Sequence, residues 1–514
     1  MPRTPALLLA ATLSLLAAAV PAQALELEVT GGSTPGPMSL DVHPGYYPLE
    51  FMMVVPSFQS GPTPLSVFDP LDPRTVDIGT DLLSNAWLGA CGLDLHMRLG
   101  PYQLGAVPAL QDLAIYFQAF TLLGGPTIID RISNPAAFRL GIAGTFRQRF
   151  AFTVDDRAFG VVLPRLDRRW MVVGGGRGQL LAQNAHATTD VYDPFTDTFA
   201  AGPMLTTPRS LHTATQLGDG RWLITGGVNQ TNDPQALCEI YDPVLDTFTA
   251  CAPMGTPRMG HTASLLPNGK VLVTGGLQAV SVTPTQLQAV RDAVDTTELY
   301  DPLLDSWTPG PNLRTPRAAH AAITRPDGKV LLLGGISWDT VIIIGWLPAV
   351  RATCDLYDPA ANSIVAGPSM ATSRSMSDPI DLGNGRWLLA GGISSLTLTN
   401  LGTPTANAEI YDAVANTWTS VGAMATARGN HKGFALGGGQ FLLAGGGNGT
   451  ILSPVALSSC EVFSTATNTF SPGPSLTSAR AGAAAFLTPQ GQVQFFGGAT
   501  TGGSITNSTE WYYF

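Results

Sequence analysis

The segment RMGHTASLLPNGKVLVTGG, from Arg258 to Gly276, decides the fold. An arginine is followed by an apolar run, an Asn-Gly turn and a second apolar run ending in Gly-Gly, which together predict a β-hairpin. RAAHAAITRPDGKVLLLGG, from Arg317 to Gly335, repeats the pattern at the same spacing. Seven arginines stand seventeen residues before the first glycine of a Gly-Gly pair: Arg157, Arg209, Arg258, Arg317, Arg374, Arg428 and Arg480.

Each repeat continues with an acidic residue two positions before an aromatic one. The acids are Asp190, Glu239, Glu298, Asp355, Glu409, Glu461 and Glu510. In the second repeat we expect four strands, a to d, over Thr213–Leu217, Trp222–Thr225, Leu237–Tyr241 and Thr247–Ala250. A four-stranded unit recurring every 49 to 59 residues is typical of a β-propeller. We therefore predict a seven-bladed β-propeller over residues 144–514.

The seventh repeat contains strands a, b and c, up to Glu510–Phe514, but no strand d. A blade one strand short would expose an unpaired edge, which native sheets avoid. Residues 144–154 lie immediately upstream of the first repeat. Phe146 stands eleven residues before Arg157, whereas the apolar residue of strand d in the other six blades stands ten before the next arginine, so we expect a one-residue bulge. We expect this segment to complete the last blade and close the ring.

Composition excludes several classes of protein. The 514 residues include 57 glycines and 40 prolines, and 12% are charged while 45% are hydrophobic. Disordered chains have low hydrophobicity and high charge, and helical bundles are rich in Glu and Lys with few helix breakers. The formal net charge of −10, with no basic run, argues against nucleic-acid binding.

The N-terminal third differs from the repeats. Residues 1–24 contain Arg3, an apolar stretch and Ala22-Gln23-Ala24, the pattern of a secretory signal peptide. We expect an exported protein without a membrane span, located at the cell surface, outside the cell or in the periplasm. Residues 25–143 contain short alternating runs, including Leu93–Leu99 and Leu113–Leu122, which predict a small, β-rich, sandwich-like domain.

The repeats resemble kelch repeats. A Gly-Gly pair, a spaced Tyr and a spaced Trp or Phe are the signature of that family, and the bacterial form adds Arg-x-x-His and an Asp-Gly-Lys-Val turn. Both additions stand here as Arg317-Ala318-Ala319-His320 and Asp327-Gly328-Lys329-Val330. The resemblance implies a propeller similar to the central domain of galactose oxidase-like proteins. It leaves the function open, because kelch propellers serve both as binding modules and as enzymes.

The arginines and the acids have two interpretations. Strands a and c run parallel within a blade and carry their charges near their starts, so we predict that each arginine pairs with an acid. The alternative is a ring of arginines around an anionic ligand. Three residues after the arginine stand four histidines, which either line the channel as ligand or metal-binding groups or bond locally to a neighbouring turn: His212, His261, His320 and His431.

Five cysteines are present. If Tyr241 lies opposite Phe248 on the adjacent strand, Cys238 lies opposite Cys251, and we predict a disulfide between them. Cys91, Cys354 and Cys460 have no evident partner.

The sequence favours a binding module over an enzyme. Such a module would recognise a protein or a glycan through its d–a and b–c loops. Two b–c loops are long, Leu277–Thr296 and Ile336–Thr353, and the second contains Trp338 and Trp346 as candidate contact residues. An exposed apolar loop is a candidate contact surface, although this one could instead fold onto the N-terminal domain.

The alternative is a carbohydrate-active enzyme. A sugar-acid mutarotase would use channel Arg, His and Glu residues, but no catalytic pair is specific to one blade. A copper-radical sugar oxidase is less favoured, because Tyr513 is the one propeller tyrosine outside the repeat position and no Tyr-His dipeptide occurs. No motif predicts a cofactor or a resident metal, and we expect a monomer.

Overall fold

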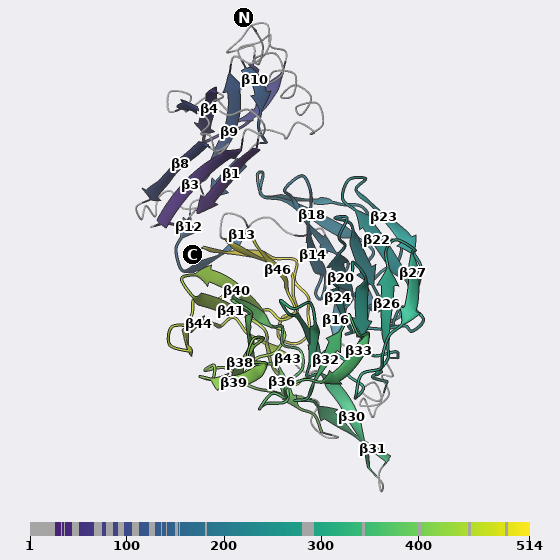
Figure 1. Ribbon diagram of the computed structural model, residues 1–514. Coiled ribbons are helices and arrows are strands. Elements are labelled where there is room, and N and C mark those ends of the chain that lie inside the picture. The colour runs from purple at the N-terminus through teal and green to yellow at the C-terminus, as the bar shows by residue number, and fades with distance from the viewer. Residues whose placement is uncertain are drawn as a thin grey trace, which may run out of the picture. The chain divides into compact units, whose positions relative to one another are not determined.

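The computed structural model describes residues 26–31, 33–34, 36–43, 51–65, 74–78, 86–90, 97–104, 113–122, 129–134, 136–139, 141–149, 153, 155–179, 182–279, 292–341, 345–397, 402–450, 454–488 and 492–513. The predicted signal peptide lies outside these residues. The chain forms two compact units: residues 1–143 with 488–492 and 513–514, and residues 144–487 with 493–512 (Figure 1). Among the described residues, no helix has the length and apolarity needed to cross a membrane.

The first unit is a small β-sandwich. One sheet has the order β1 (Glu26–Gly31), β3 (Gly36–His43), β8 (Met97–Leu104). The other has the order β10 (Ile129–Ile132), β9 (Ala114–Leu122), β4 (Phe51–Ser57), β7 (Trp87–Ala90), with β11 (Ala136–Arg139) also paired to β9. Two minor pairs are β2 (Ser33–Thr34) with β12 (Gly141–Ile142), and β5 (Ser60–Pro64) with β6 (Thr75–Ile78).

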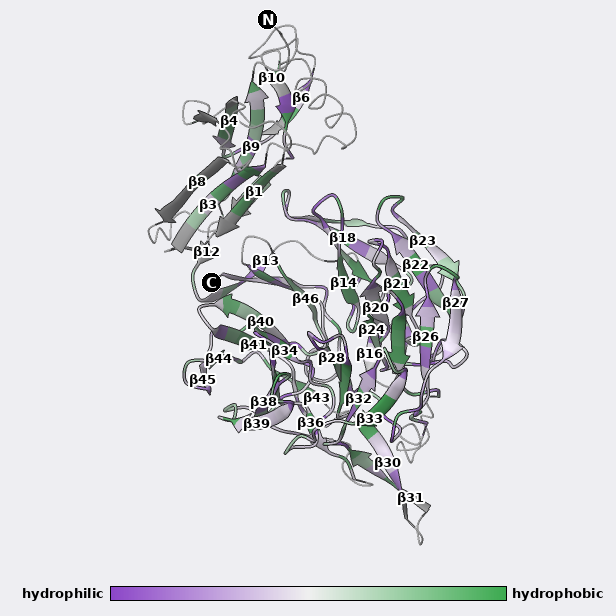
Figure 2. Cartoon of the chain, in the orientation of Figure 1, coloured by the Kyte–Doolittle hydropathy of each residue, from purple (hydrophilic) through white to green (hydrophobic). Residues whose placement is uncertain are grey.

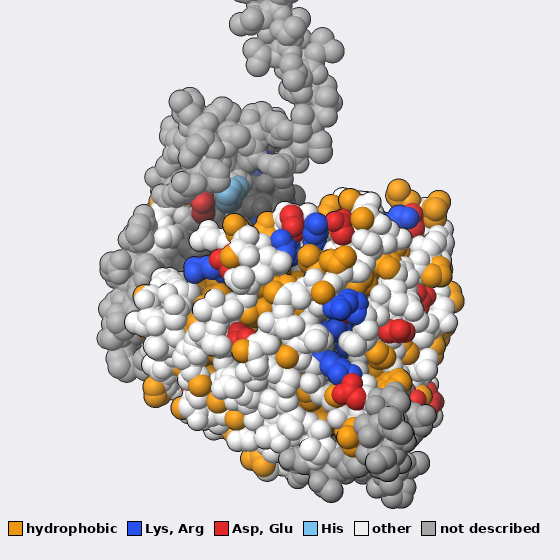
Figure 3. Space-filling view, turned by 60° about the horizontal axis from the view of Figure 1, so that its bottom comes forward, with side chains coloured by type: hydrophobic (Ala, Val, Ile, Leu, Met, Phe, Trp, Pro, Cys, Tyr) orange, Lys and Arg blue, Asp and Glu red, His pale blue; other side chains and the backbone are white. Residues whose placement is uncertain are grey.

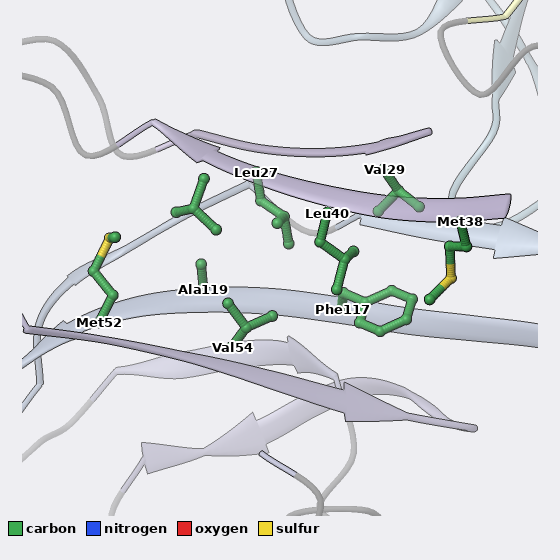
Figure 4. Close-up of a cluster of buried hydrophobic side chains, with 9 residues drawn as sticks. Leu27, Val29, Met38, Leu40, Met52, Val54, Phe117 and Ala119 are labelled. Atoms are coloured by element: carbon green, nitrogen blue, oxygen red, sulfur yellow. The ribbon is translucent and has the colours of Figure 1, made fainter. Parts of the chain in front are cut away.

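Alternating apolar residues of the two sheets face one another. Leu27 and Leu40 from the first sheet pack against Val54 and Phe117 from the second (Figure 4). This confirms the sandwich that alternation predicts. Of the strand expected at Leu93–Leu99, residues 97–99 lie in β8, which pairs with β3, and residues 93–96 lie outside the described residues.

The described part of the second unit contains seven four-stranded antiparallel sheets, each in the order a-b-c-d. Blades 1 to 4 consist of β14 (Val161–Pro164), β15 (Trp170–Val173), β18 (Thr189–Asp193) and β19 (Thr198–Ala201); β20 (Thr213–Gln216), β21 (Trp222–Thr225), β22 (Cys238–Asp242) and β23 (Thr247–Cys251); β24 (Thr262–Leu265), β25 (Val271–Thr274), β26 (Thr297–Asp301) and β27 (Ser306–Pro309); and β28 (Ala321–Thr324), β29 (Val330–Leu333), β32 (Cys354–Asp358) and β33 (Ser363–Ala366).

Blades 5 to 7 complete the propeller. They consist of β34 (Ile380–Gly383), β35 (Arg386–Ala390), β38 (Ala408–Asp412) and β39 (Thr417–Val421); β40 (Lys432–Gly437), β41 (Gln440–Ala444), β44 (Cys460–Ser464) and β45 (Thr469–Pro472); and β46 (Ala484–Leu487), β47 (Val493–Phe496), β48 (Thr509–Tyr513) and β13 (Thr145–Arg149). The a strands of neighbouring blades adjoin, as β20 adjoins β24 and β24 adjoins β28, so they form the inner ring. The seven-bladed, all-β architecture predicted from the repeats is confirmed.

Strand β13 closes the ring as predicted. It pairs with β48 in blade 7, and the ring of Phe146 lies 4.9 Å from that of Tyr512 and 5.8 Å from that of Phe495. The missing strand d thus comes from the segment before the first blade, and the last sheet has no open edge there.

Apolar side chains from facing sheets form the cores between blades. Leu223 and Cys238 of blade 2, for example, cluster with Val271 and Tyr300 of blade 3. In Figure 2 hydrophobic residues are concentrated on the strands, including β14 and β46. Each repeat tyrosine of blades 1 to 5 also donates a hydrogen bond from its hydroxyl to the Asp or Asn five residues later, in the c–d turn, as Tyr192 does to Asp197 at 2.8 Å.

Four b–c connections form additional hairpins. They belong to blades 1, 4, 5 and 6 and consist of β16 (Gly176–Gln179) with β17 (Ala182–Ala185), β30 (Ile336–Val341) with β31 (Gly345–Val350), β36 (Ile393–Ser395) with β37 (Thr403–Pro404), and β42 (Gly447–Gly449) with β43 (Pro454–Ala456).

Candidate functional site

The repeat arginines are buried and fully engaged inside their own blades. Arg209 donates hydrogen bonds to Glu239 Oε1 at 2.9 Å, to Gly226 O at 3.0 Å and to Leu237 O at 2.6 Å. All seven arginines pair with the acid of the same repeat, at 2.5 to 3.1 Å, as the equal spacings predict: Arg157–Asp190, Arg209–Glu239, Arg258–Glu298, Arg317–Asp355, Arg374–Glu409, Arg428–Glu461 and Arg480–Glu510.

The acids also fix the d–a loops. Glu239 accepts hydrogen bonds from the backbone N–H groups of Thr206 and Thr207, at 2.6 and 3.2 Å. Burial lowers the pKa of Arg317, and the charge of Asp355 opposes that shift. Because each guanidinium is buried on a carboxylate and two carbonyls, this geometry does not support a ring of arginines around an anionic ligand.

The Gly-Gly pairs connect the blades. Gly227 donates its N–H to the carbonyl of Arg258 in the next blade at 2.8 Å, and the same bond from Gly498 to Arg157, at 2.9 Å, joins blade 7 to blade 1. A Cβ at Gly226 would lie 2.5 Å from Arg258 O, and this residue has a φ of +59°. Only glycine combines that close approach with a left-handed backbone.

The four histidines lie between blades. His261 of blade 3 is 5% exposed, and its Nε2 lies 3.1 and 3.0 Å from the hydroxyls of Thr213 and Thr225 in blade 2. His320 has the same arrangement with Thr262 and Thr274.

Burial keeps these imidazoles neutral. It lowers the pKa values of His212, His261 and His431 to about 3, with the nearest repeat arginine as the next cause. Burial, and the bonds of His261 and His320 to threonine hydroxyls of the preceding blade, favour the local, structural interpretation for those two, and a binding role for the four histidines remains a prediction. The described residues contain no cluster of three or more His, Cys, Asp or Glu side chains arranged for a metal ion.

Trp338 is partly buried and not free on a loop. Its side chain packs against an apolar cluster from the b–c loops of blades 2 and 3 that includes Val228 and Leu277, and its carbonyl accepts a hydrogen bond from Arg351 at 2.8 Å. The side chain of Trp346, residues 342–344 and residues 280–291 lie outside what the structure describes. The proposed contact roles of the two tryptophans remain predictions.

Cys238 and Cys251 are register partners on β22 and β23, as the sequence predicts. Both are free thiols in the structure, so the disulfide itself remains a prediction. Their mutual hydrogen bond, together with burial, raises the pKa of Cys238. Burial raises the pKa of Cys354 to about 12 and that of Cys460 to about 11, whereas Cys91 lies outside the described residues.

A ring of backbone surrounds the propeller axis on the face that carries the d–a and b–c loops. The residues two positions after each repeat arginine all have left-handed φ values of 48° to 59°. Six hydrogen bonds of 2.7 to 3.2 Å run from the N–H of one to the carbonyl of the one in the preceding blade. We call these residues the axial collar: Phe159, Leu211, Gly260, Ala319, Met376, Asn430 and Gly482.

A small pocket of about 50 Å³ lies beside the collar, over blades 5, 6, 7 and 1. Collar residues Phe159, Met376 and Asn430 line it, together with Ile393 and the start of the blade 6 hairpin at 447–450. We call it the loop-face pocket.

The pocket exists because three blades have glycine or alanine at a repeat position where the other blades have a larger apolar side chain. In every blade the residue after the arginine bridges to the residue after Gly-Gly. Blades 2 to 5 have Val228, Leu277, Ile336 and Ile393 after Gly-Gly, whereas blades 1, 6 and 7 have Gly176, Gly447 and Ala499. The sequence analysis did not predict this pocket, although the sequence shows that the residue after Gly-Gly is small in blades 1, 6 and 7.

One charged pair breaks the repeat on the inner ring. Asp378 Oδ2 lies 3.0 Å from Lys432 Nζ, with side chains 69% and 36% exposed. The other blades have Val, Thr or Ala at this position, four residues after the arginine. The charge of Lys432 lowers the pKa of Asp378, which favours an ionised carboxylate at neutral pH.

Solved structures of other proteins are similar to this architecture. A fungal alcohol oxidase of the AA5 family, in complex with copper, matches with a TM-score of 0.55 and 16% identity, over 71% of this chain and 76% of that one. The propeller is of the kelch type. The structure of YjhT also matches, with a TM-score of 0.44 and 14% identity, over 59% of this chain and 94% of that one. No protein-family model and no curated protein matches the sequence.

The described side chains of this kelch propeller do not fit a copper-radical site. Such a site needs tyrosine and histidine ligands directed at one point. The repeat tyrosines of blades 1 to 5 bond to their own c–d turns, as Tyr300 does to Asp305 at 2.9 Å. The repeat histidines are separated between blades, and the described b–c hairpins contribute neither residue type to the loop-face pocket.

Proposed function

We propose that this protein is an exported, monomeric binding module whose kelch propeller recognises a protein or a glycan on its loop face. Residues 1–24 support export, and the loop-face pocket is the observation that supports recognition there. Hairpins β36–β37 and β42–β43 border the pocket through Ile393 and Asn448. Concave sites with a few placed polar groups are the usual form of ligand sites.

The surface chemistry supports the same proposal. Figure 3 shows hydrophobic side chains scattered over the described surface, with Lys and Arg side chains and several Asp and Glu side chains among them. The repeat arginines and acids, which the sequence offers as reactive groups, are paired with one another inside the blades. The loop face offers amides, hydroxyls, apolar side chains and exposed backbone, and its loops also carry the ion pairs Arg177–Asp156 and Arg351–Asp339.

The proposal is tested by a substitution that fills the pocket with a larger side chain. Gly447→Ile introduces the residue that blades 4 and 5 have at the same position, Ile336 and Ile393, and Gly447 does not have a left-handed φ. Gly218→Ile is the matched control, because a Cβ there meets nothing within 4 Å and the residue lies on an a–b turn.

The mature protein would be screened on a displayed peptide library and on a glycan array. We expect specific binders whose affinity falls at least tenfold in Gly447→Ile and stays unchanged in Gly218→Ile. Binders that are indifferent to both substitutions, or no binders at all, would contradict recognition through this pocket.

A carbohydrate-active enzyme of the sugar-acid mutarotase type is the second candidate. The pair Asp378–Lys432 favours it, because this pair supplies the blade-specific acid and base that such a reaction needs. Exchange between the ring forms of a sialic acid, followed by NMR with the wild type and with Asp378→Asn, tests it. Equal exchange with and without the protein would rule it out for that substrate.

A further inference from the structure

Among the described residues that line it, the loop-face pocket has no charged side chain. Its side chains are those of Phe159, Met376 and Ile393, the amides of Asn430 and Asn448, and one hydroxyl, that of Thr450; the remaining lining residues are glycine and alanine. Burying an ionised group without a partner is costly. The lining therefore selects an uncharged occupant with a large apolar part.

The volume limits the size of that occupant. A cavity needs roughly 10–15 Å³, measured this way, for each water molecule, so a pocket of about 50 Å³ holds about three to five heavy atoms. The side chains of Leu, Ile and Met each have about four heavy atoms and are among the groups proteins bury most readily. A hexose with its hydroxyls has several times as many and cannot be enclosed here.

The side-chain amides of Asn430 and Asn448 can bind the main chain of the residue whose side chain enters the pocket. Among the described residues, the side-chain amide of Asn430 donates a long contact of 3.8 Å to the sulfur of Met376, and the amide oxygen of Asn448 accepts the N–H of Gly449 at 2.7 Å. The amide of Asn430 can donate and accept, and the NH₂ group of Asn448 can donate. A peptide main chain offers the complementary acceptor and donor.

We propose that the loop-face pocket takes a single aliphatic side chain, Leu, Ile or Met, from a segment of a protein partner, whose main chain bonds to Asn430 and Asn448. This rests on the proposed function of the loop face and names its ligand chemistry. Met376 suits such a role, because its flexible side chain adapts to occupants of slightly different shape.

The experiment uses small capped probes on the full chain. N-acetyl-leucine methylamide and N-acetyl-methionine methylamide are titrated and followed by saturation-transfer NMR, with N-acetyl-aspartate methylamide and methyl galactopyranoside as competing classes. We expect the leucine and methionine probes to bind with Kd values on the order of millimolar, as very small ligands do, and the aspartate probe to bind at least tenfold more weakly.

Substitutions locate the binding. Gly447→Ile should weaken both apolar probes at least tenfold, and Gly218→Ile should leave them unchanged. Asn430→Gly keeps the left-handed φ of 52° available and should weaken the capped probes about threefold to tenfold by removing the amide. Gly429→Ser, whose new Cβ has no neighbour closer than 3.7 Å, fills less space and should have an intermediate effect. Circular dichroism and melting temperature confirm that each variant is folded.

The outcomes separate this inference from the proposed function. If the glycoside binds, is lost in Gly447→Ile, and the apolar probes do not bind, the loop face is a binding site but its occupant is not a peptide side chain. If the apolar probes bind equally to wild type and Gly447→Ile, the pocket assignment is overturned. If no probe binds and the peptide and glycan screens also fail, both proposals fall together.

Discussion

Arg209→Met tests the arginine–acid pair as the element that holds each blade together. The substitution keeps an unbranched apolar stem but removes the guanidinium. It leaves Glu239, 1% exposed, with its two backbone N–H bonds but no counter-charge, and it leaves the carbonyls of Gly226 and Leu237 without this donor. Breaking a buried ion pair from one side costs about 3–5 kcal/mol, and each stranded acceptor about 1–3 kcal/mol.

These contributions overlap, so we expect a loss of about 4–6 kcal/mol in the free energy of unfolding. Arg221→Met is the matched control in the same blade. Arg221 pairs with Asp219 at 2.7 Å, but the side chains are 37% and 47% exposed, and exposed pairs contribute about 0–1 kcal/mol.

Urea denaturation followed by tryptophan fluorescence and by circular dichroism measures both variants. Coincident transitions of the two signals and an unchanged urea dependence show that the difference reflects stability. A difference of less than about 1 kcal/mol between Arg209→Met and Arg221→Met would refute the reasoning, because the buried network would then contribute no more than a surface pair.

Three further predictions concern closure, pH and oxidation. Phe146→Ala should lower the unfolding free energy by about 2–3 kcal/mol, because it removes the ring that packs on Tyr512 across the closing strand; an unchanged urea midpoint would contradict this. Since the pKa of folded His261 is about 3 and that of an unfolded histidine about 6.5, the unfolded state takes up the proton first on acidification. Stability should therefore fall by up to about 1.4 kcal/mol per pH unit below about 6.5, and His261→Gln should reduce this slope in unfolding measurements at several pH values. Protein exported to an oxidising compartment should contain a Cys238–Cys251 disulfide in mass spectra of unreduced peptides; finding both thiols free would exclude it.

The sequence predicts what depends on spacing alone. A constant interval from arginine to Gly-Gly, and from acid to aromatic, fixes where each side chain lies in a four-stranded meander, so the pairing of Arg374 with Glu409 and the closure through Phe146 follow without coordinates. The opposition of Cys238 and Cys251 follows in the same way, since antiparallel partners have a constant sum of residue numbers.

The axial collar could not be predicted because its geometry belongs to the ring. Its members share a left-handed backbone but no residue type, and Phe159, Leu211 and Met376 are residues that rarely adopt it. Hydrogen bonds to the neighbouring blades impose the conformation. The histidines show the opposite difficulty: their type suggested metal chemistry, and only the hydroxyls of Thr213 and Thr225 in the preceding blade reveal what His261 binds.

Ring closure has a consequence for how this chain reaches its native state. Thr153 and Asn507, next to the closing strands, bond although they are 354 residues apart. Bringing such distant segments together costs about 5 kcal/mol of chain entropy, which is repaid only when β13 joins β48. Contacts this remote in sequence form slowly. We therefore expect a late folding intermediate that is a nearly complete but open ring, with unpaired strand edges exposed to aggregation and to proteases until the seam forms.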